Sequence, residues 1–448
     1  MADLVGRESL IAAPSFFERR DLLLESLRRS LCSLPEPPGV PRRIAVLLSA
    51  SRGGSSLLYR LLSRHPQVYS LGGEETPYFR LWGFQWRGRP GESDALAPEG
   101  ARDEKRRRGL ARFMLARSGR AWRPPAPFPL ESYARECAER LLLQWPERGL
   151  GRDELREAAL SLLKRPGRVE RFDAAGFWRE FLSFLRRQGV DLDDSRYDTA
   201  ERCPAGKKRP SPPFEAACIE EPPFVIPWPR NPLESADMRD RVLLLKASAD
   251  CYRVDFLRAL FPRSRFLFIH LSRNPAASIN GLIEGWLSEG FHSHPVGLVE
   301  PLNIGGYSTR EKPWTRVWWK FDLPPRWGRL RGAPLQEVAA YQWTSAHRRV
   351  IESTANVPEG DFLRLRYEDL LDDERFPSVM ERLAAFLDCD RGGFPMRCRE
   401  LPVVMAVTPP APGKWRARRS QIEPLLKSLD VRETAGRLGY VEPWETWP

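Results

Sequence analysis

Long apolar runs are missing from this chain of 448 residues. No stretch approaches the roughly 18 consecutive apolar residues that a membrane-spanning helix needs. The N-terminus carries Asp3, Arg7 and Glu8 and lacks the apolar core of a secretory signal peptide. The seven cysteines form no C-x-x-C pair, and their odd number argues against a disulfide framework. We therefore expect a cytoplasmic protein with no integral membrane segment.

Histidine is scarce as well, with five residues in the whole chain. His292 and His294 form one close pair, but two further ligands at a spacing suited to zinc are missing, so we expect no metal site. The net charge is +12, yet the basic residues are spread along the chain, with short clusters such as 106–108 and 416–419. This spread favours an anionic ligand or surface over nucleic acid as the main partner.

The most informative segment is residues 44–58, where an apolar run ends in a loop of small residues and passes into a helical pattern. A buried strand, a glycine-rich turn and a helix N-terminus together make a site for an oxyanion. Ser55 and Ser56 add hydroxyl donors, and Arg52 adds a fixed positive charge. The loop lacks the Gly-Lys of the nucleotide-triphosphate loop, so it suits a phosphate-like group held in another way.

Strand and helix patterns alternate along much of the chain, which predicts an α/β fold with a parallel sheet flanked by helices. We expect strands at 43–49, 68–69, 242–245, 266–269 and 361–366. Helices are expected at 15–33, 55–64, 103–117, 131–145, 152–163, 173–188, 251–261, 333–355, 375–388 and 420–439. This pattern predicts an N-terminal helical arm at 1–40 and a main domain at 41–448. Within that domain, about 100–235 reads as a helical and proline-rich insertion, with 204–235 as an irregular connection.

Four polar residues follow the ends of predicted strands: Arg52, Lys246, Arg273 and Tyr367. In parallel sheets the carboxyl ends of the strands meet at one edge, and ligands bind there. We therefore expect these four side chains to lie on a common rim.

Several motifs, in this order, resemble sulfotransferases that use 3′-phosphoadenosine-5′-phosphosulfate (PAPS). Residues 51–58 are similar to the family's phosphosulfate loop, R-S-G-T-T-L, and His65-Pro66 to the pair after the loop helix. Ile269 to Pro275 is similar to the strand and R-D-P motif that binds the 3′-phosphate. Arg366 to Leu370 resembles Y-E-D-L, and Gly413 to Arg416 resembles a G-x-W-basic loop. The chain thus resembles this family, which implies a P-loop-type sheet as its fold.

The resemblance implies roles for individual residues. Arg52 and Lys246 would act on the phosphosulfate, where charge develops on the leaving phosphate during in-line transfer. The donor would further contact Gly53, Gly54, Ser55, Ser56, Leu57, Arg273, Ser278, Asn280, Tyr367, Lys414, Trp415 and Arg416. Gly281 stands where the family has a second 3′-phosphate ligand, so Ser278 and Asn280 are the substitutes nearby.

A hydroxyl acceptor needs a general base. Gly73-Glu74-Glu75-Thr76 is similar to the G-E-E-T of protein-tyrosine sulfotransferases, which implies Glu75 as the base and leaves Glu74 as the alternative. The motif is compatible with a peptide tyrosine or a small molecule as acceptor. The aromatic residues at 286 and 314–327 predict either an apolar acceptor wall or packing within a surface loop. Part of that stretch resembles bacterial members of the family.

The function expected from the sequence is transfer of a sulfuryl group from PAPS to a hydroxyl acceptor. One alternative is a P-loop nucleotide kinase or phosphotransferase, which would show magnesium-dependent ATP activity. The other is a non-catalytic nucleotide-binding protein, which would bind the nucleotide without turnover.

Overall fold

The computed structural model describes residues 13–31, 36–84, 86–98, 103–170, 172–198, 217–441, 443, 444 and 447. Its centre is a seven-stranded sheet with the order β4-β3-β2-β5-β1-β6-β9. The strands are β1 (Arg43–Leu48), β2 (Val68–Ser70), β3 (Gly119–Ala121), β4 (Arg230–Pro232), β5 (Val242–Leu245), β6 (Arg265–Ser272) and β9 (Phe362–Arg366). Five of them run parallel, while β3 and β4 complete one edge in antiparallel pairing.

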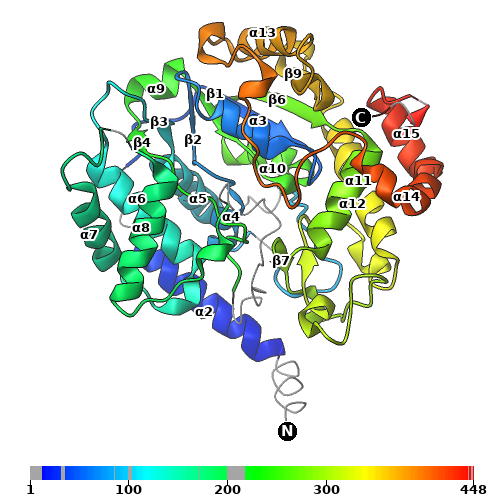
Figure 1. Cartoon of the computed structure of the whole chain (residues 1–448), viewed down its shortest axis with the longest axis horizontal. Helices are drawn as coiled ribbons and strands as arrows, with labels where there is room; N and C mark the ends of the chain where they lie inside the picture. Colours follow the sequence, from blue (N-terminus) through cyan, green and yellow to red (C-terminus); the bar gives the residue numbers. More distant parts are fainter. Residues whose placement is uncertain are drawn as a thin grey trace.

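Helices pack on both faces of this sheet (Figure 1). They are α2 (Ala13–Leu31), α3 (Ser55–Leu62), α4 (Thr76–Leu81), α5 (Glu104–Arg117), α6 (Leu130–Gln144), α7 (Arg152–Leu163), α8 (Ala174–Arg187), α9 (Ser235–Asp240), α10 (Val254–Leu260), α11 (Pro275–Leu287), α12 (Leu335–Ser353), α13 (Phe376–Leu387), α14 (Arg419–Leu426) and α15 (Leu429–Arg437). A separate two-stranded ribbon joins β7 (His292–His294) to β8 (Trp319–Lys320). The predicted α/β class is therefore confirmed.

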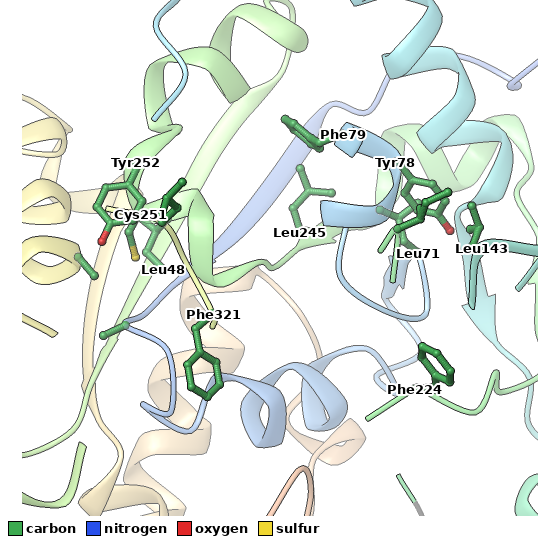
Figure 2. Close-up of a cluster of buried hydrophobic side chains, with 14 of the residues drawn as sticks. Leu48, Leu71, Tyr78, Phe79, Leu143, Phe224, Leu245, Cys251, Tyr252 and Phe321 are labelled. Carbon is green, nitrogen blue, oxygen red and sulfur yellow. The ribbon is translucent and has the colours of Figure 1, made fainter. Parts of the chain in front are cut away.

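The core has two layers because alternate strand residues point to opposite faces of the sheet. Ala45 and Leu47 of β1 pack with α3 and α13, whereas Ile44, Val46 and Leu48 face the larger layer that includes α10 and α12. Figure 2 shows part of this larger layer, where Leu48 and Leu245 lie among aromatic side chains of α4 and of the turn after β5. Both faces of β1 are buried, which explains its continuous apolar run.

Most of the elements predicted from the sequence are present, with ends that differ by a few residues. The single helix predicted at 420–439 is wrong, because the chain forms α14 and α15 instead. Ser428 adopts an extended backbone (ψ 144°) between them, and its hydroxyl donates to the carbonyl oxygen of Leu425 at 2.6 Å. Serine competes in this way for the last carbonyl groups of a helix and ends it.

The region at about 100–235 supplies α5 to α8 and also the two edge strands β3 and β4. Figure 1 shows α6, α7 and α8 gathered at the end of the sheet that carries these strands. Residues 204–216 of the predicted irregular connection lie outside the described residues, as do Cys32 and Cys203. At the other end of the chain, Leu24, Leu27 and Leu31 of α2 belong to the main core. The domain boundaries stay a prediction.

Candidate active site

The loop between β1 and α3 has a backbone that few residue types tolerate. Arg52 has φ 65° and Gly54 has φ 91°, and Gly54 is the N-cap of α3. A Cβ atom on Gly53 would lie 2.3 Å from Ser49 Oγ, and one on Gly54 would lie 2.1 Å from Tyr367 Cδ2. Glycine is therefore required at both positions. The turn presents the first backbone N–H groups of α3 at the carboxyl edge of the sheet.

This edge opens into a cavity of about 350 Å³. The four residues expected on one rim, Arg52, Lys246, Arg273 and Tyr367, all line it. The other expected donor contacts that line it are Gly54, Ser55, Ser56, Leu57, Asn280, Lys414 and Trp415. The size of the cavity is within the range typical of small-molecule sites.

Three expected donor contacts lie elsewhere. Gly53 is buried behind the loop, against Ser49 and the carbonyl group of Ala50. Ser278 is fully buried, and its hydroxyl donates to the carbonyl oxygen of Arg273 at 3.4 Å. Arg416 is exposed and donates to the carbonyl oxygen of Trp447 at 3.3 Å. Spacing alone did not show that these three residues do not line the cavity.

Lys246 is a buried cation of the cavity, with 4% of its surface exposed. Its Nζ donates to Ser56 Oγ at 3.2 Å and forms an ion pair with Glu74. The side chain of Glu74 lines the cavity and is 37% exposed. Enclosure raises the pKa of this carboxyl group, and Lys246 partly opposes that shift. Glu74 is thus a carboxylate with raised basicity beside a cation.

Glu75, the base implied by the sequence motif, is fully buried and does not line the cavity. Its Oε2 accepts a hydrogen bond from the backbone N–H of Lys246 at 3.0 Å, which fixes the end of β5. Burial, and next the neighbouring Asp250, raise the pKa of Glu75 well above its usual range. Glu75 Oε1 and Asp250 Oδ1 receive no hydrogen bond from any described donor. A proton held between the two carboxyl groups would satisfy both oxygens.

Arg273 lies beside the loop, at the far side from Lys246 along the sheet edge. Its Nη1 donates to the carbonyl oxygen of Arg52 at 3.4 Å, and its guanidinium lies 4.9 Å from the ring centroid of Tyr367. A Cβ atom on Gly281 would lie 3.4 Å from Arg52 Cβ and 4.0 Å from Arg273 Nη1, which is ordinary contact distance. Gly281 therefore leaves room between the two arginines, and no backbone constraint requires glycine there.

The segment from Leu401 to Gly413 forms one wall of the cavity. The carbonyl oxygen of Met405 accepts a hydrogen bond from Arg52 Nη1 at 2.7 Å. Glu284 on α11 holds the far end of the segment through Lys414 at 3.1 Å and Thr408 at 2.9 Å. Glu284 was missed by the sequence analysis because it belongs to no motif.

Two other acidic residues also went unnoticed in the sequence. Asp322 accepts hydrogen bonds from Ser51 Oγ at 2.5 Å and from Tyr252 at 3.0 Å, which anchors the loop from below. Burial raises the pKa of Asp322 to about 6. Glu368 accepts from the backbone and side-chain nitrogens of Asn274 at 2.9 Å and thereby fixes the turn after β6. Glu368 lies inside the Y-E-D-L segment, so a signal for it was present.

Most tryptophans of the aromatic-rich stretch are buried, and only Trp314 is half-buried. Trp286, Trp319 and Trp327 are at most 1% exposed. Two phenylalanines of the same region, Phe291 and Phe321, line the cavity instead. The prediction of an apolar wall is therefore wrong for these tryptophans, and Trp415, which borders the cavity, is itself 1% exposed.

The histidines have structural contacts. His294 Nε2 lies 3.1 Å from Asp94 Oδ2, and His270 Nε2 lies 2.9 Å from His347 Nδ1. Among the described residues, no group of three or more His, Cys, Asp or Glu side chains is arranged to hold a metal ion. Within that same part of the chain, no helix is long and apolar enough to cross a membrane.

Comparisons with known proteins give two solved structures. The sulfotransferase domain from the Synechococcus PCC 7002 olefin synthase is 15% identical, with a TM-score of 0.35, and the match covers 92% of this chain and 100% of that domain. The sulfotransferase domain from the curacin biosynthetic pathway is 12% identical, with a TM-score of 0.34, and the match covers 90% of this chain and 100% of that domain. No protein-family model matches the chain, and a search of curated proteins finds no match.

Proposed function

We propose that this chain is a sulfotransferase that moves a sulfuryl group from PAPS to a hydroxyl acceptor. The observation that carries the proposal is the cavity at the carboxyl edge of the sheet. There Arg52, Lys246 and Arg273 gather at the N-terminus of α3, and Glu74 adjoins Lys246. Positive charges and backbone N–H groups are what a phosphosulfate and a second phosphate require.

The residues present are suited to such a donor. Arg52, Ser55 and Ser56 would hold the phosphosulfate, with Lys246 at its bridging oxygen. Arg273 would bind the 3′-phosphate, with Asn280 beside it. Lys414 and Trp415 would border the nucleotide.

The chemistry is an in-line displacement. The bond between sulfur and the bridging phosphate oxygen breaks while a bond from sulfur to the acceptor oxygen forms. The hydroxyl proton passes to a carboxylate, and we assign this role to Glu74 instead of Glu75 because Glu74 lines the cavity. Lys246 stabilises the charge that develops on the leaving phosphate. The reaction needs no metal ion in this scheme.

Calorimetric titration with 3′-phosphoadenosine-5′-phosphate (PAP), and separately with ATP and Mg²⁺, tests the proposal. We expect PAP to bind more tightly than ATP, and Arg273→Ala to weaken PAP binding by about 10- to 100-fold, the usual range for a charge-assisted contact. Arg187→Ala, an equal charge change on the exposed face of α8, is the control and should bind PAP like the wild type. A preference for ATP with Mg²⁺ would support a phosphotransferase instead.

A gain of affinity is expected from Gly281→Ser. The new Cβ has ordinary contact distances, and its hydroxyl would lie near Arg273, where a phosphate oxygen can accept from it. We expect PAP to bind about three- to tenfold more tightly, the range of one neutral hydrogen bond. Gly436→Ser in α15, where a Cβ meets no atom within 4 Å, controls for the better helix propensity of serine. Equal PAP affinities in the wild type and Gly281→Ser would contradict the placement of the 3′-phosphate.

A further inference from the structure

Backbone strain is concentrated around the cavity. Six non-glycine residues in the described part of the chain have positive φ, and four of them line the cavity. These four are Arg52 (φ 65°), Phe291 (φ 63°), Phe321 (φ 63°) and Met405 (φ 53°). A left-handed backbone is unfavourable for bulky side chains such as phenylalanine, and such outliers cluster at ligand sites. The proposed donor site assigns no role to the two phenylalanines. Their strained backbone therefore points to a second ligand in the same cavity.

Phe291 and Phe321 form a stacked pair at the base of the β7–β8 ribbon. Their ring centroids are 4.8 Å apart with an angle of 29° between the planes. The backbone N–H of Phe321 donates to the carbonyl oxygen of Phe291 at 3.3 Å, which locks the pair. Phe321 belongs to the core cluster of Figure 2 and also lines the cavity.

This pair adjoins the anion-binding end of the cavity. The Arg52 guanidinium carbon lies 5.4 Å from the ring centroid of Phe291. A molecule that rests on the rings therefore reaches the place where Arg52 would hold the sulfuryl group. Pro77, Pro223 and Val225 extend the apolar surface on the same cavity.

The charged side chains near this surface are already neutralised. Glu221 pairs with Arg80 and accepts a hydrogen bond from Ser293 at 2.9 Å. Glu220 pairs with Arg140 at 3.0 Å and also accepts from Gln144. Among the described residues, the wall therefore offers a ligand apolar contact, and its two carboxylates, Glu220 and Glu221, are both paired.

We propose that the acceptor is an uncharged alcohol or phenol with an apolar body, which rests on Phe291 and Phe321 and turns its hydroxyl group toward Glu74. This inference rests on the proposed sulfotransferase function. An apolar body gains from leaving water at such a wall. A sugar would lose water from several hydroxyl groups that find few free partners there.

The first test is a panel of acceptors with radiolabelled PAPS. The probes are 2-naphthol, 1-octanol and methyl β-D-glucopyranoside. We expect kcat/KM for at least one apolar probe to exceed that of the glucoside by about 100-fold, a ratio that apolar pockets achieve when a polar competitor must be desolvated. Preference between naphthol and octanol distinguishes an aromatic from an alkyl acceptor. Comparable or better turnover of the glucoside, or no turnover of either apolar probe by protein that binds PAP, would overturn the inference.

The second test uses Phe291→Asn and Phe321→Asn. Asparagine tolerates positive φ, so these variants remove the rings without forcing the backbone to change. We expect the affinity for 2-naphthol, measured by calorimetry without donor, to fall about tenfold, as loss of an aromatic contact predicts, while PAP affinity is unchanged. Arg326→Asn, at an exposed positive-φ residue away from the cavity, is the matched control.

These measurements separate the two levels of the proposal. Failure to bind PAP would contradict the sulfotransferase function. The affinity for 2-naphthol is measured without donor, so it would test the apolar wall even in that case. Unchanged naphthol affinity in both phenylalanine variants would overturn the inference even if PAP binds tightly.

Discussion

Glu74→Gln is expected to lower kcat by about 10²- to 10⁴-fold, the range for loss of a general base, and to leave PAP affinity nearly unchanged. The amide keeps the size of the carboxyl group but cannot take the proton of the acceptor hydroxyl. Enclosure raises the pKa of Glu74. As the pH is lowered, the wild-type rate should therefore begin to fall at a pH above the usual pKa of a glutamate. That acidic limb should disappear in the residual rate of the variant.

Glu75→Gln is the matched comparison, since it makes the same change one residue away. Glu75 is buried, and its raised pKa favours the protonated form, whose lack of charge an amide shares. Its oxygen can still accept from the backbone N–H of Lys246. We expect most of the activity to remain. Loss of activity in Glu75→Gln with an active, equally stable Glu74→Gln would return the base role to Glu75.

Lys246→Met is the second substitution with a large expected effect, a loss of about 10²- to 10³-fold in kcat, as for removal of one electrostatic donor. Methionine fills much of the same volume but provides no charge for the leaving phosphate. It also removes the cation that opposes the rise in the pKa of Glu74, so the acidic limb should move to higher pH. Rates measured across pH with saturating acceptor would reveal both effects.

Lys312→Met is the control for this variant. Lys312 forms an exposed ion pair with Glu289 at 2.7 Å, away from the cavity, so its loss changes the net charge equally. Full activity is expected in this control. A Lys246→Met protein with unchanged kcat and an unshifted profile would remove Lys246 from the reaction.

The common rim of the cavity could be predicted because parallel strands carry their following residues to the same edge. Apolar runs at β1, β5 and β6 identified the strands, and Arg52, Lys246 and Arg273 then had to converge. Which of Glu74 and Glu75 lines the cavity could not be predicted in this way. It depends on which carboxyl group meets the backbone N–H of Lys246, a contact between residues far apart in the sequence.

Short elements without a regular pattern also could not be predicted from the sequence. Strands β3 and β4 have three residues each and contain glycine, arginine, asparagine and proline, types that seldom indicate a strand. Phe291 and Phe321 gave no sign of their positive φ, because the usual residues there are glycine and asparagine. Only the surrounding packing imposes that conformation.

The pairing of β3 with β4 has a consequence for the design of shortened or chimeric versions of the chain. Gly119 lies opposite Pro232. The polypeptide between them therefore forms one continuous excursion from the sheet, meaning a segment that leaves the sheet at β3 and returns to it at β4. Excising that excursion would take both edge strands away and leave β2 as a bare edge, open to pairing with another molecule. In the intact chain, β4 at the outer edge carries Pro232, which cannot donate to a further strand. The excursion is therefore no detachable module, and shortened or chimeric versions of this protein should retain both of its ends.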